Sequence, residues 1–77
     1  MKRKYELFLD DIVENVDRIQ RFVSGMSFDD FKDDEKTVYA VSRSLEIIGE
    51  SVSQIPDEVR DKYDDIPWRD IEYLCGT

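Results

Sequence analysis

The chain has 77 residues, enough for one small domain, and carries a formal net charge of -8 at pH 7. Hydrophobic residues make up 40% of it, as in globular domains, while the 39% share of charged residues predicts long solvated faces. The acidic balance disfavours unaided binding of nucleic acid, no apolar run approaches the ~18 residues that span a membrane, and a single cysteine excludes an internal disulfide.

The first periodic stretch, residues 5–26, predicts a long helix. Its apolar residues recur in steps of three and four, which places them on one helical face with charged side chains opposite. Gly25 near its end suits a helix C-cap. The apolar residues are Tyr5, Phe8, Leu9, Ile12, Val16, Ile19, Val23 and Met26.

A serine then opens a short second element. The Ser27 hydroxyl can accept from free backbone amides at a helix start, so we predict a helical turn with Phe28 and Phe31 packed inward. Five carboxylates crowd this segment: Asp29, Asp30, Asp33, Asp34 and Glu35. They offer either a weak site for a divalent cation or a solvated helix start, and the absence of calcium-loop spacing favours the helix start.

The second apolar stripe predicts another long helix. Its steps alternate between three and four, as in a heptad repeat, over Val38, Val41, Leu45, Ile48, Val52 and Ile55. Asp33 or Asp34 can cap its start. Pro56 ends it, because proline lacks an amide hydrogen and disfavours a helical residue before it.

Two prolines divide the remaining residues. Pro56–Tyr63 reads as a short helix with proline in its first turn. After a turn, Pro67 opens a last helix in which Trp68, Ile71 and Leu74 lie three apart and share a face. A helix this short is marginal in water, so we expect it either to dock on the others or to fray.

These elements predict an all-α fold in a single domain, residues 1–77: a small bundle of two long antiparallel helices with short helices packed across them. The stripes offer more apolar surface than so small a chain buries alone. We therefore expect self-association, with an interface formed by Val38, Val41, Leu45, Ile48 and Val52. The basic start is followed by a segment, residues 5–11, that is too short and too acidic for a signal peptide, so we expect a cytoplasmic protein.

The residues by themselves indicate no enzyme. The chain contains no His to act as a general base and no glycine-rich phosphate loop, and its serines have no His partner. We expect no catalytic residue, no metal site and no cofactor.

Several segments follow one another in an order typical of a known family. They are Ser27 to Phe31, Asp34 with Thr37, Arg43 to Glu50, Ile55 with Pro56, and Ile66 to Arg69. Together they resemble the HepT-like toxin family, a branch of the HEPN superfamily of small helical ribonucleases. The resemblance covers nearly the whole chain, from Ile12 to Ile71.

The catalytic motif of that family is an Arg followed after four residues by a His. By the resemblance, the Arg would fall at Cys75, the Asn that follows it at Gly76, and the His three residues beyond Thr77. A tyrosine near that His, which a partner enzyme modifies in the family, is absent too. The resemblance thus implies a ribonuclease, yet this chain lacks the C-terminal catalytic helix, and we predict that it does not cleave RNA.

Two polar residues of the second long helix carry a weaker hypothesis. Arg43 and Glu50 are seven residues apart and share a face; the resemblance implies that this helix lies near the catalytic cleft and the dimer interface. They are either a remnant of that cleft or members of structural ion pairs. Gly49 costs about 1 kcal/mol relative to alanine in mid-helix, which close approach of another helix would explain.

The resemblance also implies partners. These are a second copy of the chain and an MntA-type nucleotidyltransferase antitoxin, with RNA bound only where an intact catalytic half is present. Three functions stay open: a HepT-like protein without the catalytic motif that keeps dimer or partner binding, a fragment or frameshifted form of an active ribonuclease toxin, and a non-enzymatic helical adaptor.

Overall fold

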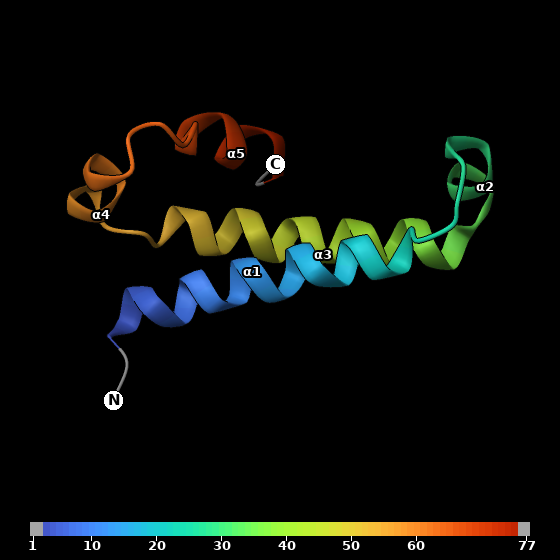
Figure 1. Ribbon diagram of the computed structural model, residues 1–77, viewed down its shortest axis with the longest axis horizontal. Coiled ribbons are helices and arrows are strands. Elements are labelled where there is room, and N and C mark those ends of the chain that lie inside the picture. The colour runs from blue at the N-terminus through green and yellow to red at the C-terminus, as the bar shows by residue number, and fades with distance from the viewer. Residues whose placement is uncertain (1–2, 76–77) are drawn as a thin grey trace.

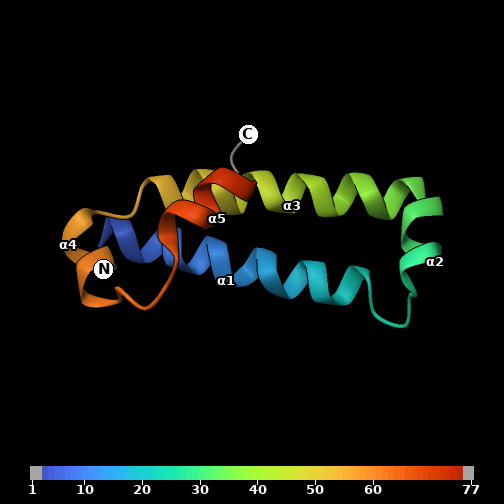
Figure 2. The ribbon, with the colours of Figure 1, turned by 90° about the horizontal axis from the view of Figure 1, so that it is seen from above.

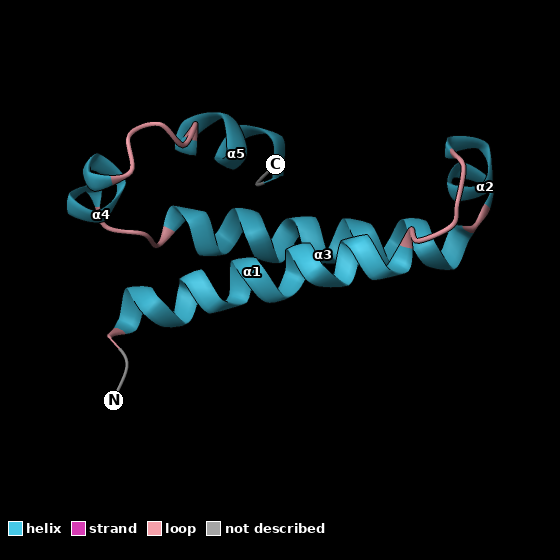
Figure 3. Cartoon of the chain, in the orientation of Figure 1, coloured by secondary structure: helices cyan, strands magenta, loops and turns pink. Residues whose placement is uncertain are grey.

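The computed structural model describes residues 3–75, which form five α-helices and no strand. The helices are α1 (Lys4–Phe22), α2 (Phe28–Asp33), α3 (Glu35–Ser53), α4 (Asp57–Lys62) and α5 (Trp68–Cys75). Figure 1 shows α1 and α3 as two long antiparallel helices, joined by α2 at one end, with α4 at the other end and α5 returning along α3. The cartoon in Figure 3 contains only helices and loops. The predicted all-α bundle is confirmed, while self-association stays a prediction.

Helix α3 is the centre of the molecule, because it packs against α1, α2 and α5. The buried apolar residues all belong to α3 or follow it directly: Val41, Ile48, Val52 and Ile55. Among the described residues of α1, by contrast, only Asn15 is buried. Figure 2 shows why: α5 lies over α3 rather than over the whole of α1. The apolar stripe of α1 is therefore only partly covered.

The acidic segment around α2 supplies helix caps. The Ser27 hydroxyl accepts from the Asp30 amide at 3.1 Å, and the Asp30 carboxylate accepts from the Ser27 amide at 3.2 Å, which completes a capping box. The Asp34 carboxylate accepts from the Thr37 amide at 3.2 Å and caps α3. Of the two predicted caps of the second long helix, the structure thus selects Asp34.

The turn after α1 requires its glycine. α1 ends at Phe22, a few residues before the end of the predicted stretch. Gly25 has φ +77°, a conformation that costs glycine least, and it directs the chain toward α2.

Two predicted core positions are wrong. Phe28, the first residue of α2, is 76% exposed. Leu74 is 74% exposed. Three-residue steps drift on a 3.6-residue helix, so Leu74 lies about 120° from Trp68, whereas Cys75 lies within about 20° of it. Cys75 accordingly lines the same apolar surface as Trp68 and Ile71.

Candidate functional site

Arg60 on α4 contacts the end of α3 and the helix α5. Its Nη2 donates to the Val52 carbonyl at 2.6 Å, which also accepts from the Ile55 amide at 3.1 Å, and its Nε donates to the Ile55 carbonyl at 3.2 Å, just beyond the end of α3. Nη2 also donates to Oε1 of Glu72 on α5 at 2.8 Å, and the side chain of Arg60 is only 15% exposed. The guanidinium lies 5.9 Å from the centroid of the Trp68 ring. These contacts fix the position of α5 on α3.

Trp68 is the second anchor of α5. Its indole Nε1 donates to the Tyr63 carbonyl at 3.1 Å, and the residue is half-buried. Gly49 is buried and lines a shallow pocket together with Glu72 of α5, and the close approach of another helix at Gly49 stays a prediction.

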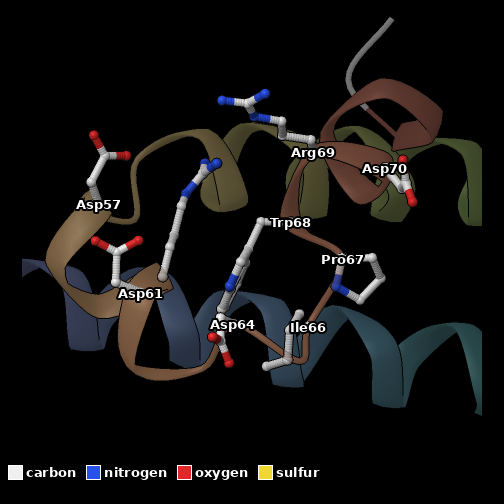
Figure 4. Close-up of a pocket in the computed structure, with 9 residues that line it drawn as sticks. Asp57, Asp61, Asp64, Ile66, Pro67, Trp68, Arg69 and Asp70 are labelled. Carbon is white, nitrogen blue, oxygen red and sulfur yellow. The ribbon is translucent and has the colours of Figure 1, made fainter.

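An open pocket of about 340 Å³ lies between α4 and α5. In Figure 4, Asp57 and Asp61 project from α4, and Arg69 projects from the start of α5. Four carboxylates line this pocket together with two guanidinium groups, one of which is the engaged side chain of Arg60. The excess of negative charge disfavours a phosphate group here.

The two polar residues suggested as a cleft remnant are both exposed on α3. Arg43 forms an ion pair with Glu46, with 3.3 Å between Nη1 and Oε2. Glu50 lies further along the helix, where it lines two shallow pockets beside Ser53. Arg43 thus takes part in a local pair within α3.

The residues of the predicted interface fall into a buried group and a more exposed group. Val41, Ile48 and Val52 are buried inside the single chain. Val38 is partly exposed, and Leu45 is 37% exposed. Only the last two are open to another molecule in the folded chain.

An apolar groove runs between α1 and α5, with α3 as its floor. Its volume is about 470 Å³. Leu45, Ile48 and Val52 form the floor. α1 contributes Leu9, Ile12, Val13, Val16, Ile19 and Gln20, and the other wall contains Ile66, Trp68, Ile71 and Cys75. Sequence patterning missed this groove because the groove depends on where α5 lies, although most of its α1 residues belong to the predicted stripe.

Residues 3–75 contain no group of three or more His, Cys, Asp or Glu side chains arranged to hold a metal ion. In the same range, no helix is long and apolar enough to cross a bilayer. The distinctive features of the described chain are therefore the Arg60 contacts, the acidic pocket and the apolar groove.

Comparison with known proteins decides the family. The family model described as Ribonuclease HepT-like matches residues 12–74. The chain belongs to the HepT-like ribonuclease family.

Named relatives agree with this assignment. The protein named Putative RNase MJ0127 of Methanocaldococcus jannaschii is 44% identical over 95% of this chain and 60% of its own length. Probable ribonuclease HepT of Thermococcus cleftensis is 42% identical over 92% of this chain and 64% of its own length. The HepT-like chain described here thus spans about three-fifths of these relatives. No solved structure matches it significantly.

The structure describes one of the two positions that the resemblance assigns to catalytic residues. Cys75, where the resemblance would put the family's Arg, lies one residue beyond the matched segment; it is half-buried at the end of α5 and lines the apolar groove. Gly76, where the resemblance would put the Asn, lies outside the described residues. A thiol provides neither the fixed positive charge nor the forked donors of a guanidinium.

Sequence reasoning also missed Arg60. Its position four residues after Pro56, just beyond the end of a long helix, was the available signal, because basic side chains bind the last free carbonyls of helices. The pairing with Glu72 spans twelve residues, and no local pattern predicts a contact of that range.

Proposed function

We propose that these 77 residues form the non-catalytic scaffold of a HepT-like module, which binds partners but does not cleave RNA. The observation that carries the proposal is that these 77 residues contain no His, and the resemblance would put the family's catalytic Arg at Cys75. The proposal concerns these 77 residues, and the relatives extend well beyond the matched part.

The missing side chains have defined tasks in RNA cleavage. The 2'-hydroxyl must lose a proton before it attacks phosphorus, which suits a His that titrates near neutral pH. A guanidinium stabilises the charge that builds on the phosphoryl oxygens. Arg69, the exposed guanidinium nearest the end of the chain, lines a pocket rich in carboxylates and has no general base of the His type beside it.

Expression in a bacterial host tests this proposal. Induction of the 77-residue chain alone is expected to leave growth and cellular RNA unchanged. Growth arrest accompanied by cleavage of cellular RNA would contradict the proposal, provided that a Pro substitution in the middle of α3, which unfolds the chain, abolishes both effects.

A nucleotidyltransferase of the MntA type is the proposed protein partner. Membership of the HepT-like family supports it, because members of this family are associated with toxin–antitoxin modules. Titration calorimetry of the purified chain with a nucleotidyltransferase of the MntA type is expected to give saturable binding. Absence of heat at every ratio, with both proteins folded, would contradict this partnership.

A second copy of the chain is the other proposed partner, in keeping with the two apolar stripes. Val38 and Leu45 are the members of the predicted interface that a second copy can reach without unfolding the first. Sedimentation velocity over a range of concentrations reports the mass directly.

A second candidate function is the scaffold part of an active ribonuclease. The observation that favours it is the span of about three-fifths of the relatives' length. Reading the gene beyond the Thr77 codon in all three frames distinguishes the two candidates, because only the second requires an Arg, four residues and a His in one of those frames.

A further inference from the structure

We propose that α5 is a releasable strap: it detaches from α3 while the other helices stay folded, and the ion pair between Arg60 and Glu72 holds it closed. The part of α3 beneath α5 then becomes accessible to other molecules without unfolding of the whole chain. This opening concerns the fold alone and does not depend on whether the chain cleaves RNA.

Helix α5 contributes no buried residue to the core. It has eight residues, Trp68–Cys75, and none of them is buried. The buried apolar residues lie on α3 or directly after it. A helix of this length is marginal in water once it leaves the surface on which it packs. Segments with little buried apolar surface open at a lower cost in free energy than the domain as a whole.

Arg60 provides a fixed partner for α5. Its Nη2 donates to the Val52 carbonyl at 2.6 Å and its Nε to the Ile55 carbonyl at 3.2 Å, which holds the guanidinium against the end of α3. The same Nη2 donates to Oε1 of Glu72 at 2.8 Å. The side chains of this pair are 15% and 34% exposed, so solvent and salt screen it less than the exposed pairs on α1 and α3.

The hydrogen bonds at the start of α5 are local. The indole Nε1 of Trp68 donates to the Tyr63 carbonyl at 3.1 Å, and the Trp68 amide donates to the Ile66 carbonyl at 2.9 Å. Both acceptors lie in the loop of residues 63–67 that joins α4 to α5. Release of α5 therefore breaks its contacts with Arg60 and its packing on α3, whereas these local bonds can move with it.

The strap covers a defined part of α3. Gly49 is buried and lines one shallow pocket together with Glu50, Ser53 and Glu72. Glu72 is the residue of α5 at this pocket, so movement of α5 away from α3 opens the surface around Gly49. Access to that surface is thus set by the contact between Glu72 and Arg60.

Native-state hydrogen exchange of the 77-residue chain, followed by NMR, measures this opening. The Ile71 amide donates to the Pro67 carbonyl at 3.0 Å and reports on α5, while the Ile48 amide reports on the middle of α3. We expect the Ile71 amide to be protected, at a level at least about tenfold below that of Ile48, because α5 opens at a lower cost than the whole chain.

Two substitutions on α5 test the role of the ion pair. Glu72→Ala is expected to speed exchange at the Ile71 amide by about tenfold, because it removes a charge-assisted hydrogen bond that the closed state contains and the open state lacks. Asp70→Ala is the matched control. It removes a carboxylate from the same helix that forms no ion pair within residues 3–75, and is expected to speed exchange at Ile71 by at most about threefold.

Asp34→Ala tests whether α5 opens independently of α3. The Asp34 carboxylate caps the far end of α3, so the cap stays in place when α5 alone opens and is lost when α3 unfolds. This variant is therefore expected to speed exchange at the Ile48 amide by about fivefold and to leave exchange at Ile71 within about twofold of the parent.

Three results would overturn the proposal. Equal acceleration at Ile48 and Ile71 in Asp34→Ala would mean that α5 and α3 unfold together. Equal acceleration at Ile71 by Glu72→Ala and Asp70→Ala would mean that the Arg60 pair does not hold α5 closed. Exchange of the Ile71 amide in the parent at the rate of an unfolded chain would mean that α5 is not docked at all.

Discussion

At the scale of single residues, Arg60 does the most to organise the chain. Its guanidinium binds two carbonyls at the end of α3 and the Glu72 carboxylate on α5. Arg43, by comparison, forms one exposed ion pair within α3. Charge-assisted hydrogen bonds of a mostly buried Arg contribute more to stability than exposed ion pairs do.

Replacement of Arg60 is therefore expected to destabilise the fold. Arg60→Ala should lower the free energy of unfolding by about 2 kcal/mol, because it removes the side-chain donor to the Ile55 carbonyl, one donor to the Val52 carbonyl and the partner of the Glu72 carboxylate. Arg60→Lys should recover only part of this loss, because an ammonium lacks the planar fork of a guanidinium. Urea denaturation measures both.

Arg43→Ala is the control for that series, with an expected loss below about 0.5 kcal/mol. An equal loss for Arg60→Ala and Arg43→Ala would mean that the Arg60 contacts contribute nothing beyond an exposed ion pair.

At the scale of elements, α3 is the helix on which the others depend, and its start is held by one side chain. The Asp34 carboxylate accepts from the Thr37 amide, while the adjacent Asp33 is the exposed last residue of α2. The sequence offered both as caps, and only the backbone geometry of the α2–α3 junction distinguishes them.

Removal of the cap tests this assignment. Asp34→Ala is expected to cost about 1 kcal/mol of stability, the usual value for an N-cap, and Asp34→Asn much less, because its amide oxygen accepts the same bond. Asp33→Ala should leave the midpoint of urea unfolding nearly unchanged. If Asp33→Ala proved the more damaging of the two alanine variants, the cap would be misassigned.

The elements themselves were predictable because each long helix has a clear apolar stripe and a clear stop. Pro56 ended the second stripe as expected, with α3 closing at Ser53. The prediction for Leu74 was wrong because two three-residue steps on an α-helix place its side chain about 120° away from that of Trp68. The prediction that Phe28 packs inward was wrong because its exposure depends on how α2 packs against α3, which is a property of the tertiary structure.

At the scale of the whole molecule, the chain is an elongated scaffold of 41 × 27 × 19 Å with an open apolar side. The stripe of the second long helix was correctly seen as a packing surface, but Val41, Ile48 and Val52 use it within the chain. The apolar surface that stays accessible to other molecules is the groove. Its prediction would have required knowledge of the position of α5. The resemblance placed the catalytic Arg at Cys75, and the structure adds that this thiol lies in an apolar lining.

The central claim is that this HepT-like scaffold does not cleave RNA, and one measurement tests it most directly. Purified chain is incubated at neutral pH with end-labelled single-stranded RNAs, beside the Cys75→Arg variant and an unrelated ribonuclease that verifies the substrate. We predict intact RNA with the parent and with the variant, because an Arg without a His still lacks the general base. Defined cleavage products that increase with the concentration of the parent chain would contradict the account.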